Sequence, residues 1–283
     1  MVNTSSNPSV NSMVRMDALF LRVLKIAFTV FIIAYIAIPV LVTLVMSFND
    51  AAAIRFPIKV WSLRWYADFF SSAQWVDALA SSITIALGTT VISTTAGVLA
   101  AWAFERFNFA FKPAVYMLIM LPLFMPGVVL GLGVAMAFGN VSVFGFNIYG
   151  TRGLVMLAHS LWAMPLVFML MEATFRTVDH RIVEASYDLG GRPLQTFFEI
   201  VLPSVSTGIV SSALFSFMIS LNEFVMALFL TTRDTQTLPV LMWLSLRSAG
   251  TPRLAVASVI LAIAVFVSLS VIMVWYIRQL RKI

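Results

Sequence analysis

The chain has 283 residues, of which 61% are hydrophobic and only 11% are charged, and its mean hydropathy is +0.98. Soluble domains carry about 25% charged residues, so this composition excludes an ordinary soluble globular protein. The absence of cysteine excludes disulfides and thiolate metal sites. We interpret the net charge of +6 as a sign of membrane topology and not of nucleic-acid binding.

Six long windows without charged residues divide the chain. A helix needs roughly 20 apolar residues to cross the hydrocarbon core of a bilayer, and each window is about that long or longer. We therefore predict an all-α, polytopic membrane protein with six transmembrane helices. The windows are residues 26–49, 78–104, 113–151, 153–171, 200–222 and 254–277.

The two ends of the chain are predicted to lie on the cytoplasmic side. Residues 1–25 form a tail that is largely disordered at its start, since residues 1–14 are uncharged and rich in Ser and Asn. With six spans both termini share one side, and more Lys and Arg residues fall on that side. Because positive charge concentrates on the cytoplasmic side, we predict an N-in, C-in transmembrane domain over 26–277 and a cytoplasmic C-terminus at 278–283.

Aromatic residues crowd the stretch VWSLRWYADFF, residues 60–70, between the first two windows. Trp61, Trp65 and Phe69 recur every four residues, which predicts a short helix lying in the outer headgroup region. Two roles stay open for this helix, anchoring at the membrane surface or docking of an external partner. The later segment 238–246 is too short to span and predicts a helix packed at the outer surface.

The third window contains Pro122 and Pro126, together with several glycines. Proline removes backbone hydrogen bonds that lipid cannot replace, so a broken helix is tolerated where it faces protein or a water-filled cavity. This window therefore predicts either a wall of a translocation pathway or a kink that allows close packing. Trp162, in the fourth window, joins the candidate pathway residues.

Two ionisable residues are expected inside the membrane. Glu223 lies about 27 Å along the fifth helix when counted from Val205, and an intramembrane carboxylate suggests a functional site. One hypothesis is that Glu223, with Asn222 and Ser220, faces the pathway and favours a cationic substrate. The alternative is a hydrogen-bonded carboxylate at a subunit interface or outer gate. His159 is predicted to be a hydrogen-bonded interior residue and not a metal ligand.

The segment 176–203 is predicted to form a cytoplasmic helix–turn–helix. Asp179 fits the N-cap of a first helix, which ends at Gly190 in a left-handed conformation, and Pro193 fits the first turn of a second helix. In that second helix one continuous apolar face is predicted, made of Leu194, Phe197, Phe198, Val201 and Leu202. Such a loop binds a partner, or its aromatic residues rest on the membrane or on neighbouring spans.

The same loop carries a resemblance to a known family. Glu184-Ala185-Ser186, three residues, Gly190, nine residues, Ile200, one residue and Leu202-Pro203 resembles the EAA loop of ABC-importer permeases, with Ser186 in place of the second alanine. The stretches NDAAAIRFPIKVWSLRWYADFF, ALASSITIALGTTVIS and LNEFVMALFLT look like the polyamine-type (spermidine/putrescine) branch. The resemblance implies a type I importer permease in the bacterial inner membrane, with one extra N-terminal span.

The resemblance also implies a role for each residue of the loop. Glu184 would pair with a basic group of a separate ATPase dimer, and Gly190 would make the turn between the two helices. Ile200, Leu202 and Pro203 would hold the loop to the transmembrane core. The residues implied for ATPase coupling are Glu184, Ala185, Ser186, Asp188, Gly190, Ile200, Leu202 and Pro203.

The chain itself is not predicted to be an enzyme. It has no G-x-x-x-x-G-K-[ST] motif for phosphate binding, so no cofactor is expected in it, and ATP and Mg would bind to the partner ATPase. The further partners implied are a second related permease, forming a heterodimer, and a periplasmic or extracellular substrate-binding protein.

Two alternative functions stay open at this stage. The first is a secondary transporter or channel that works without an ATPase, but such proteins often carry internal repeats and several charged residues in their spans, and neither is found in this sequence. The second is an ABC importer for opines, amino-acid-derived compounds or other small solutes.

Overall fold

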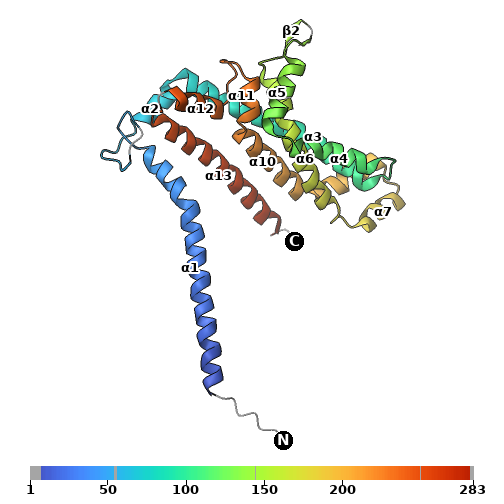
Figure 1. Cartoon of the computed structure of the whole chain (residues 1–283). Coiled ribbons are helices and arrows are strands. Elements are labelled where there is room, and N and C mark those ends of the chain that lie inside the picture. Colours follow the sequence, from blue (N-terminus) through green and yellow to red (C-terminus); the bar gives the residue numbers. More distant parts are fainter. Residues whose placement is uncertain (1–7, 54–55, 144, 249, 281–283) are drawn as a thin grey trace.

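The computed structural model describes residues 8–53, 56–143, 145–248 and 250–280, and most of them are helical (Figure 1). The helices are α1 (Pro8–Met46), α2 (Arg64–Ser71), α3 (Ala73–Arg106), α4 (Lys112–Phe124), α5 (Gly127–Phe138), α6 (Arg152–Phe175), α7 (His180–Asp188), α8 (Pro193–Thr196), α9 (Leu202–Ser204), α10 (Ser206–Asn222), α11 (Val225–Leu230), α12 (Leu238–Ser248) and α13 (Arg253–Leu280). A π-helical turn, Phe197–Val201, lies between α8 and α9.

Four helices are long and apolar enough to cross a membrane, namely α1, α3, α6 and α13. Two bent pairs could each make one more span. The first is α4 with α5, bent by 103°, and the second is α8–α9 with α10, bent by 72°. Each of the six predicted windows thus overlaps one long helix or one bent pair, and the all-α class is confirmed.

The predicted third window, residues 113–151, is longer than the helical segment that the structure shows there. Helix α5 ends at Phe138, and the chain then forms a small antiparallel hairpin of β1 (Ser142–Val143) and β2 (Phe146–Asn147). In the described part of the chain this is the only pair of named strands. It projects beyond the helices at one end of the molecule (Figure 1).

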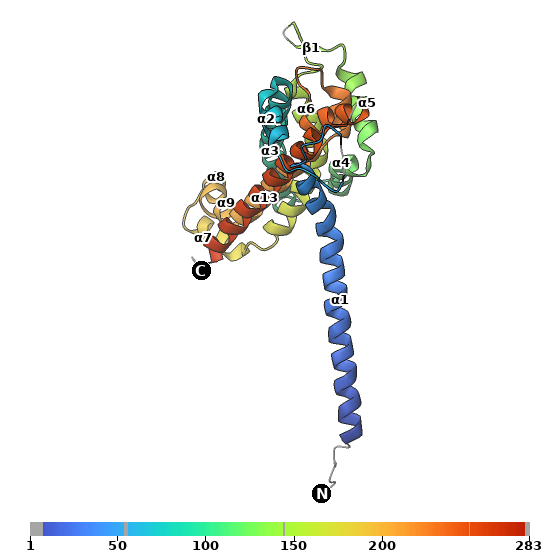
Figure 2. The same ribbon diagram turned by 90° about the vertical axis from the view of Figure 1, so that its left-hand side faces the viewer.

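Helix α1 begins at Pro8, well before residue 26 where the first span was predicted to start. The start of the predicted tail, residues 1–7, lies outside the described residues. The helix runs away from the rest of the chain and meets α13 only near its own C-terminal end (Figures 1 and 2). Its apolar side chains, such as Phe28 and Phe31, are therefore exposed within this chain. Lipid or a second chain must cover them, because apolar surface is unstable in water.

Helices α3, α6 and α10 form the centre of the molecule. Gly97 of α3 lies so close to α6 that an added Cβ would come within 2.6 Å of Val167. Val155 and Phe168 of α6 are fully buried in this packing. Both bent helix pairs pack against this centre, α4 and α5 against α6, and α10 against α3 and α6.

The aromatic segment 60–70 is a short helix, but only part of the predicted face is buried. Helix α2 starts at Arg64, so Trp61 precedes it and is exposed, whereas Trp65 and Phe69 are buried in a cluster shared with α12 and α13. Arg253 of α13 forms an ion pair with Asp68 of α2. The ion pair therefore holds α2 against the rest of the molecule. The predicted helix face of Trp61, Trp65 and Phe69 was wrong at Trp61, which lies before the helix and is exposed.

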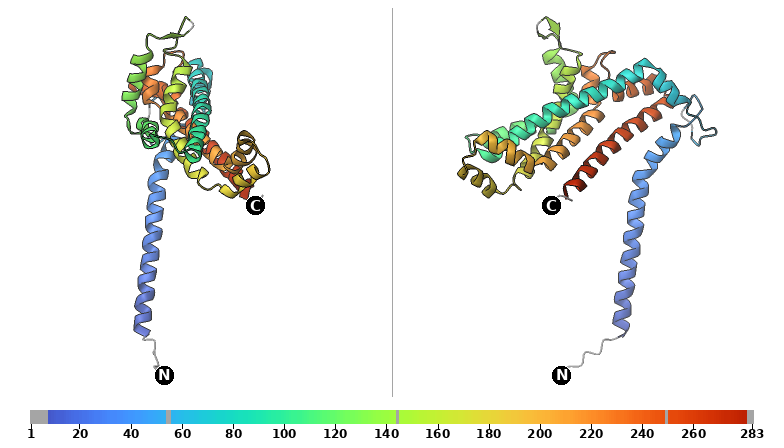
Figure 3. Two further views of the ribbon diagram at one scale, coloured as in Figure 1. Left: turned by 90° about the vertical axis from the view of Figure 1, so that its right-hand side faces the viewer. Right: turned by 180° about the vertical axis from the view of Figure 1, so that it is seen from behind.

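The loop segments gather at two opposite ends. The segment α7–α9 lies at the same end as the C-terminus of α13, and the N-terminal part of α1 extends in that direction (Figure 3). Helices α2 and α12 and the β1–β2 hairpin lie at the other end (Figures 1 and 3). We call the first the loop end and the second the hairpin end.

Candidate functional site

Two helix breaks lie beside each other on α6. Helix α4 ends before Pro126 and the chain resumes as α5, while α10 ends at Asn222 and resumes as α11. At Gly127, directly after the first break, an added Cβ would lie 2.9 Å from the Trp162 ring and 3.4 Å from Val225 Cβ, next to the second break. Such breaks free backbone groups that must find partners inside protein.

Two residues one turn apart on α6 support the two breaks. Trp162 Nε1 donates to the carbonyl oxygen of Pro122, 2.8 Å away. His159 Nε2 lies 3.2 Å from Oε2 of Glu223. Trp162 therefore satisfies a carbonyl at the first break, and His159 contacts the residue that forms the second.

Glu223 lies at the second break with its carboxylate turned into the protein. Its Oε1 accepts from Met226 N at 2.9 Å and its Oε2 accepts from Ala227 N at 3.0 Å, so it caps the start of α11. The residue is 5% exposed. Glu223 was predicted inside a continuous helix, which was wrong, because α10 ends one residue earlier and Glu223 has extended backbone angles.

A buried polar chain continues from Glu223 into α3. His159 Nδ1 lies 2.8 Å from Ser220 Oγ, and Ser220 Oγ donates to Thr89 Oγ1 at 3.2 Å. The prediction that His159 is a hydrogen-bonded interior residue is thereby confirmed. The chain joins α3, α6 and α10 around the second break.

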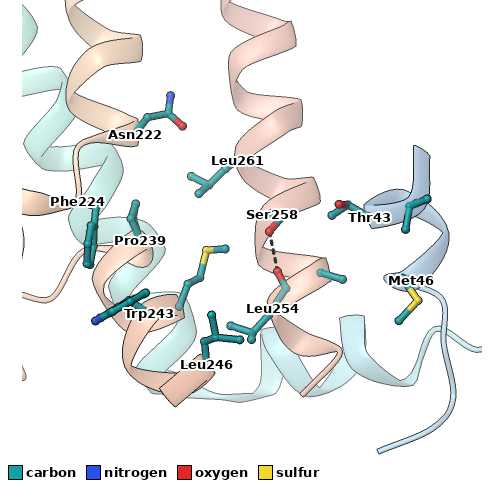
Figure 4. A pocket seen from close by; sticks show the side chains of 13 residues that line it. Thr43, Met46, Asn222, Phe224, Pro239, Trp243, Leu246, Leu254, Ser258 and Leu261 are labelled. Atoms are coloured by element: carbon teal, nitrogen blue, oxygen red, sulfur yellow. Dashed lines mark hydrogen bonds between the residues drawn. The ribbon is translucent and has the colours of Figure 1, made fainter. Parts of the chain in front are cut away.

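Asn222 differs from its neighbours Ser220 and Glu223 because it is exposed. It lines an apolar groove of about 590 Å³ between α1, α12 and α13. Phe224 and Trp243 lie on the same side of this groove as Asn222, with their rings 5.5 Å apart (Figure 4). Of the three candidates Ser220, Asn222 and Glu223, Asn222 alone therefore reaches an open surface.

The loop 176–203 has the predicted helix–turn–helix start. Asp179 Oδ1 accepts from Arg181 N at 2.9 Å and caps α7. Gly190 follows with φ of +84°, a left-handed conformation that side chains with a Cβ rarely adopt. Pro193 stands in the first turn of α8.

The second helix of the loop is not continuous, so the predicted single apolar face was wrong. The π-helical turn Phe197–Val201 divides the side chains into two groups. Phe197 and Val201 are buried, and the Phe197 ring lies 5.3 Å from that of Trp102. Leu194 and Phe198 are exposed. The loop thus rests on the helix bundle through one group and leaves the other open.

The exposed side of the loop combines acidic and apolar residues. Glu184 and Asp188 are exposed, and neither forms an ion pair with a described residue. Leu189 at the turn is also exposed, as are Leu194 and Phe198. The two acidic residues of the predicted coupling loop therefore lie at the surface, together with exposed apolar side chains of the same loop.

Ser186, the departure from the family motif, ties the two halves of the loop together. Its Oγ lies 2.9 Å from the hydroxyl of Thr196, which is 1% exposed. Gly191 N also donates to the Ser186 carbonyl at 2.8 Å. Alanine at this position would lose the hydroxyl contact.

Replacing Ser186 by alanine is expected to loosen this loop. The lost hydrogen bond costs about 1 kcal/mol, so hydrogen exchange of the amides in 184–196 should become roughly five-fold faster. Ser204→Ala is the control, since its hydroxyl bonds only the local carbonyl of Ile200. Equal exchange rates in Ser186→Ala and the unaltered protein would contradict a role for this contact.

Among the described residues no group of three or more His, Asp or Glu side chains could hold a metal ion. The candidate site therefore consists of two helix breaks on α6, an apolar groove and an exposed loop.

Comparison with known proteins agrees with this arrangement. The family described as "Binding-protein-dependent transport system inner membrane component" matches residues 93–282, more than half of the chain. The putrescine transport system permease protein PotI of Escherichia coli (strain K12) is 32% identical over 228 residues, which cover 79% of this chain and 80% of PotI. The spermidine/putrescine transport system permease protein PotC of Haemophilus influenzae is 28% identical over 249 residues, which cover 86% of this chain and 94% of PotC.

Solved structures share the fold. A chain from a bacterial ABC transporter involved in the import of the acidic polysaccharide alginate superposes with a TM-score of 0.72 at 15% identity, covering 97% of this chain and 99% of that one. A chain of the MetNI methionine ABC transporter gives a TM-score of 0.55 at 15% identity, covering 75% of this chain and 98% of that one.

Proposed function

Because the chain belongs to the family of binding-protein-dependent transport system inner membrane components, we propose that it carries a polyamine, putrescine or spermidine, across the membrane. It is a multi-pass permease subunit of an ABC importer in the bacterial inner membrane, and the ATPase activity belongs to a separate chain. The observation that carries the substrate assignment is the likeness to PotI over about four fifths of both chains.

The loop end is the proposed site of coupling to the ATPase dimer, which binds ATP and Mg. Glu184 and Asp188 meet basic groups of the ATPase, and the exposed Leu189, Leu194 and Phe198 enter an apolar cleft. An exposed loop that joins carboxylates with apolar side chains supports this proposal, since large apolar surface on one patch marks an interaction site. The loop end is then cytoplasmic, which gives the N-in, C-in orientation.

The proposed pathway runs along the two helix breaks. Asn222 faces the solute from the groove, while Ser220 and Glu223 hold the break behind it. At the neighbouring break, Pro126 stands between α4 and α5, and Trp162 holds the carbonyl oxygen of Pro122 by a hydrogen bond. Bent helices supported by hydrogen bonds can change their angle as the complex switches, because the broken segments have no continuous backbone bonding to resist it.

The second permease is the proposed cover for α1 and the apolar groove. Helix α1 stands away from its own chain with its apolar side chains exposed, and a related chain packed there would close the pathway from the other side. The proposed assembly is a heterodimer of this chain with that related permease.

Uptake of labelled putrescine and spermidine tests the proposed function. Cells that lack their own polyamine importers should accumulate the label when they express this chain with its second permease, ATPase and binding protein. Omitting the ATPase should remove the uptake. Uptake that continues without the ATPase would contradict an importer subunit, and uptake of an opine or amino acid in place of polyamines would contradict the substrate.

A further inference from the structure

A polar pocket at the hairpin end is built from three parts of the chain that lie far apart in the sequence. It measures about 430 Å³ and is lined by Gln74, Asp77, Ala78, Arg152, Arg233, Asp234 and Gln236. The first three residues come from the start of α3, Arg152 is the first residue of α6, and the last three lie between α11 and α12. We call this pocket the outer socket.

The walls of the outer socket are fixed to one another by hydrogen bonds. Thr235 Oγ1 donates to the carbonyl oxygen of Gly150 at 2.7 Å, which joins the α11–α12 connection to the start of α6. Leu238 N donates to Ser82 Oγ at 2.7 Å, which joins the same connection to α3. The socket is therefore already formed before anything binds in it, and a ligand would not have to order these segments.

The polar groups of the outer socket lack partners in the described part of the chain. Asp77, Arg152, Arg233 and Asp234 form no ion pair there. Arg152 Nε and Gln236 Oε1 are buried and have no hydrogen-bond partner among the described residues. A buried polar group without a hydrogen-bond partner destabilises the protein, so a partner that bonds to it gains affinity.

The position of Arg152 indicates the sign of that partner. A positive side chain at the start of a helix is opposed by the helix dipole, which favours negative charge there. Arginine also binds carboxylates through two parallel N–H···O bonds. Arg233 adds a second guanidinium to the same pocket. A carboxylate would offset the unfavourable charge at the helix start and occupy the buried donor.

We infer that the outer socket receives an acidic side chain of the substrate-binding protein when that protein docks on the permease. The inference rests on the proposed function, which places the hairpin end outside the cell and makes transport depend on a binding protein. The size of the pocket suits one or two side chains and not a helix. Asp77 and Asp234 balance the charge of the two arginines, but the buried Arg152 Nε is an unpartnered donor, and the ammonium groups of a polyamine, which only donate, cannot accept from it. Asp77 and Asp234 line the same pocket and would pair with a basic residue of the binding protein that lies next to its acidic side chain.

Stimulation of ATP hydrolysis by the binding protein tests the inference. The probe is the polyamine-loaded binding protein that supports uptake with this complex, added to the complete complex in lipid nanodiscs. Arg152→Gln and Arg233→Gln should each raise the concentration needed for half-maximal stimulation about ten-fold, and added salt should weaken the unaltered complex more than either variant. Arg247→Gln removes the same charge from an exposed position of α12 that does not line the socket, and should shift this concentration less than two-fold.

A cross-link gives a second readout that does not depend on charge. Because the chain has no cysteine, Gln74→Cys places a single thiol at the socket, and a thiol-attached photo-cross-linker should capture the binding protein there. Ser248→Cys on α12 should give much less product. If both arginine variants need the same concentration of binding protein for half-maximal stimulation as the unaltered complex, and residue 74 gives no cross-link, the inference is overturned while the proposed function stands. If the unaltered complex assembles but no binding protein stimulates it, the proposed function and this inference both fail.

Discussion

Glu184→Arg is expected to reduce ATP-driven polyamine uptake roughly 100-fold, to near background. Glu184 is exposed on α7 and forms no ion pair with a described residue of its own chain, so the proposed partner is a basic group of the ATPase. Breaking a charge pair at an interface costs about 2–5 kcal/mol, and arginine adds repulsion to that loss. Uptake of labelled putrescine by whole cells measures the effect.

The matched control is Glu199→Arg, the same reversal of charge on the other half of the loop. The Glu199 carboxylate bonds Gln195 one turn away, and the variant should keep uptake within about two-fold. Both variants should reach the membrane in normal amounts and copurify with the second permease, since neither carboxylate is buried. A Glu184→Arg variant that pumps at the unaltered rate would refute the proposed coupling contact, as would labelling that places residue 184 outside the cell.

Hydropathy predicted the long helices well but not where all of them end. Helices α3, α6 and α13 correspond to charge-free windows, because a helix in lipid must avoid charge over its whole length. The window 113–151 ran past the end of α5 at Phe138, since the β1–β2 hairpin that follows also lacks charge. Turn residues such as Gly139, Asn140 and Gly145 were the available signal.

Local chemistry predicted the start of the coupling loop, and tertiary packing decided the rest. The Asp179 cap and the Gly190 turn depend on neighbouring residues alone, so sequence was sufficient for both. The π-helical turn at Phe197–Val201 could not be predicted in this way, because it accompanies the packing of Phe197 against Trp102, a residue of another helix.

The pairing of His159 with Glu223 joins residues far apart in the sequence. The available signal was chemical, since both are ionisable residues expected within the membrane, where such groups tend to pair with one another. Sequence could therefore have suggested the pair. It could not indicate that the carboxylate also caps α11, because the break after Asn222 carries no proline or glycine.

Glu223→Ala is expected to destabilise the permease strongly. The change leaves Met226 N and Ala227 N without acceptors and removes the carboxylate that faces His159. Each unmet buried donor costs about 1–3 kcal/mol, so the two together cost roughly 2–6 kcal/mol, a large part of the 5–15 kcal/mol that stabilises a typical protein. Thermal unfolding of the purified complex, followed by size-exclusion chromatography, should show less folded permease and a lower melting temperature.

Two further variants separate a supporting role of Glu223 from direct binding of the solute. Glu223→Gln keeps one oxygen acceptor, so it should lose less stability than Glu223→Ala, and its uptake should fall only as far as its folded amount falls. Asn222→Ala, at the exposed neighbour, should lower uptake without changing the melting temperature. If Glu223→Ala melts at the temperature of the unaltered complex, the cap and the His159 contact do not hold the break. If Glu223→Gln is fully stable yet does not transport, the carboxylate itself meets the cation, because only its charge has then been removed.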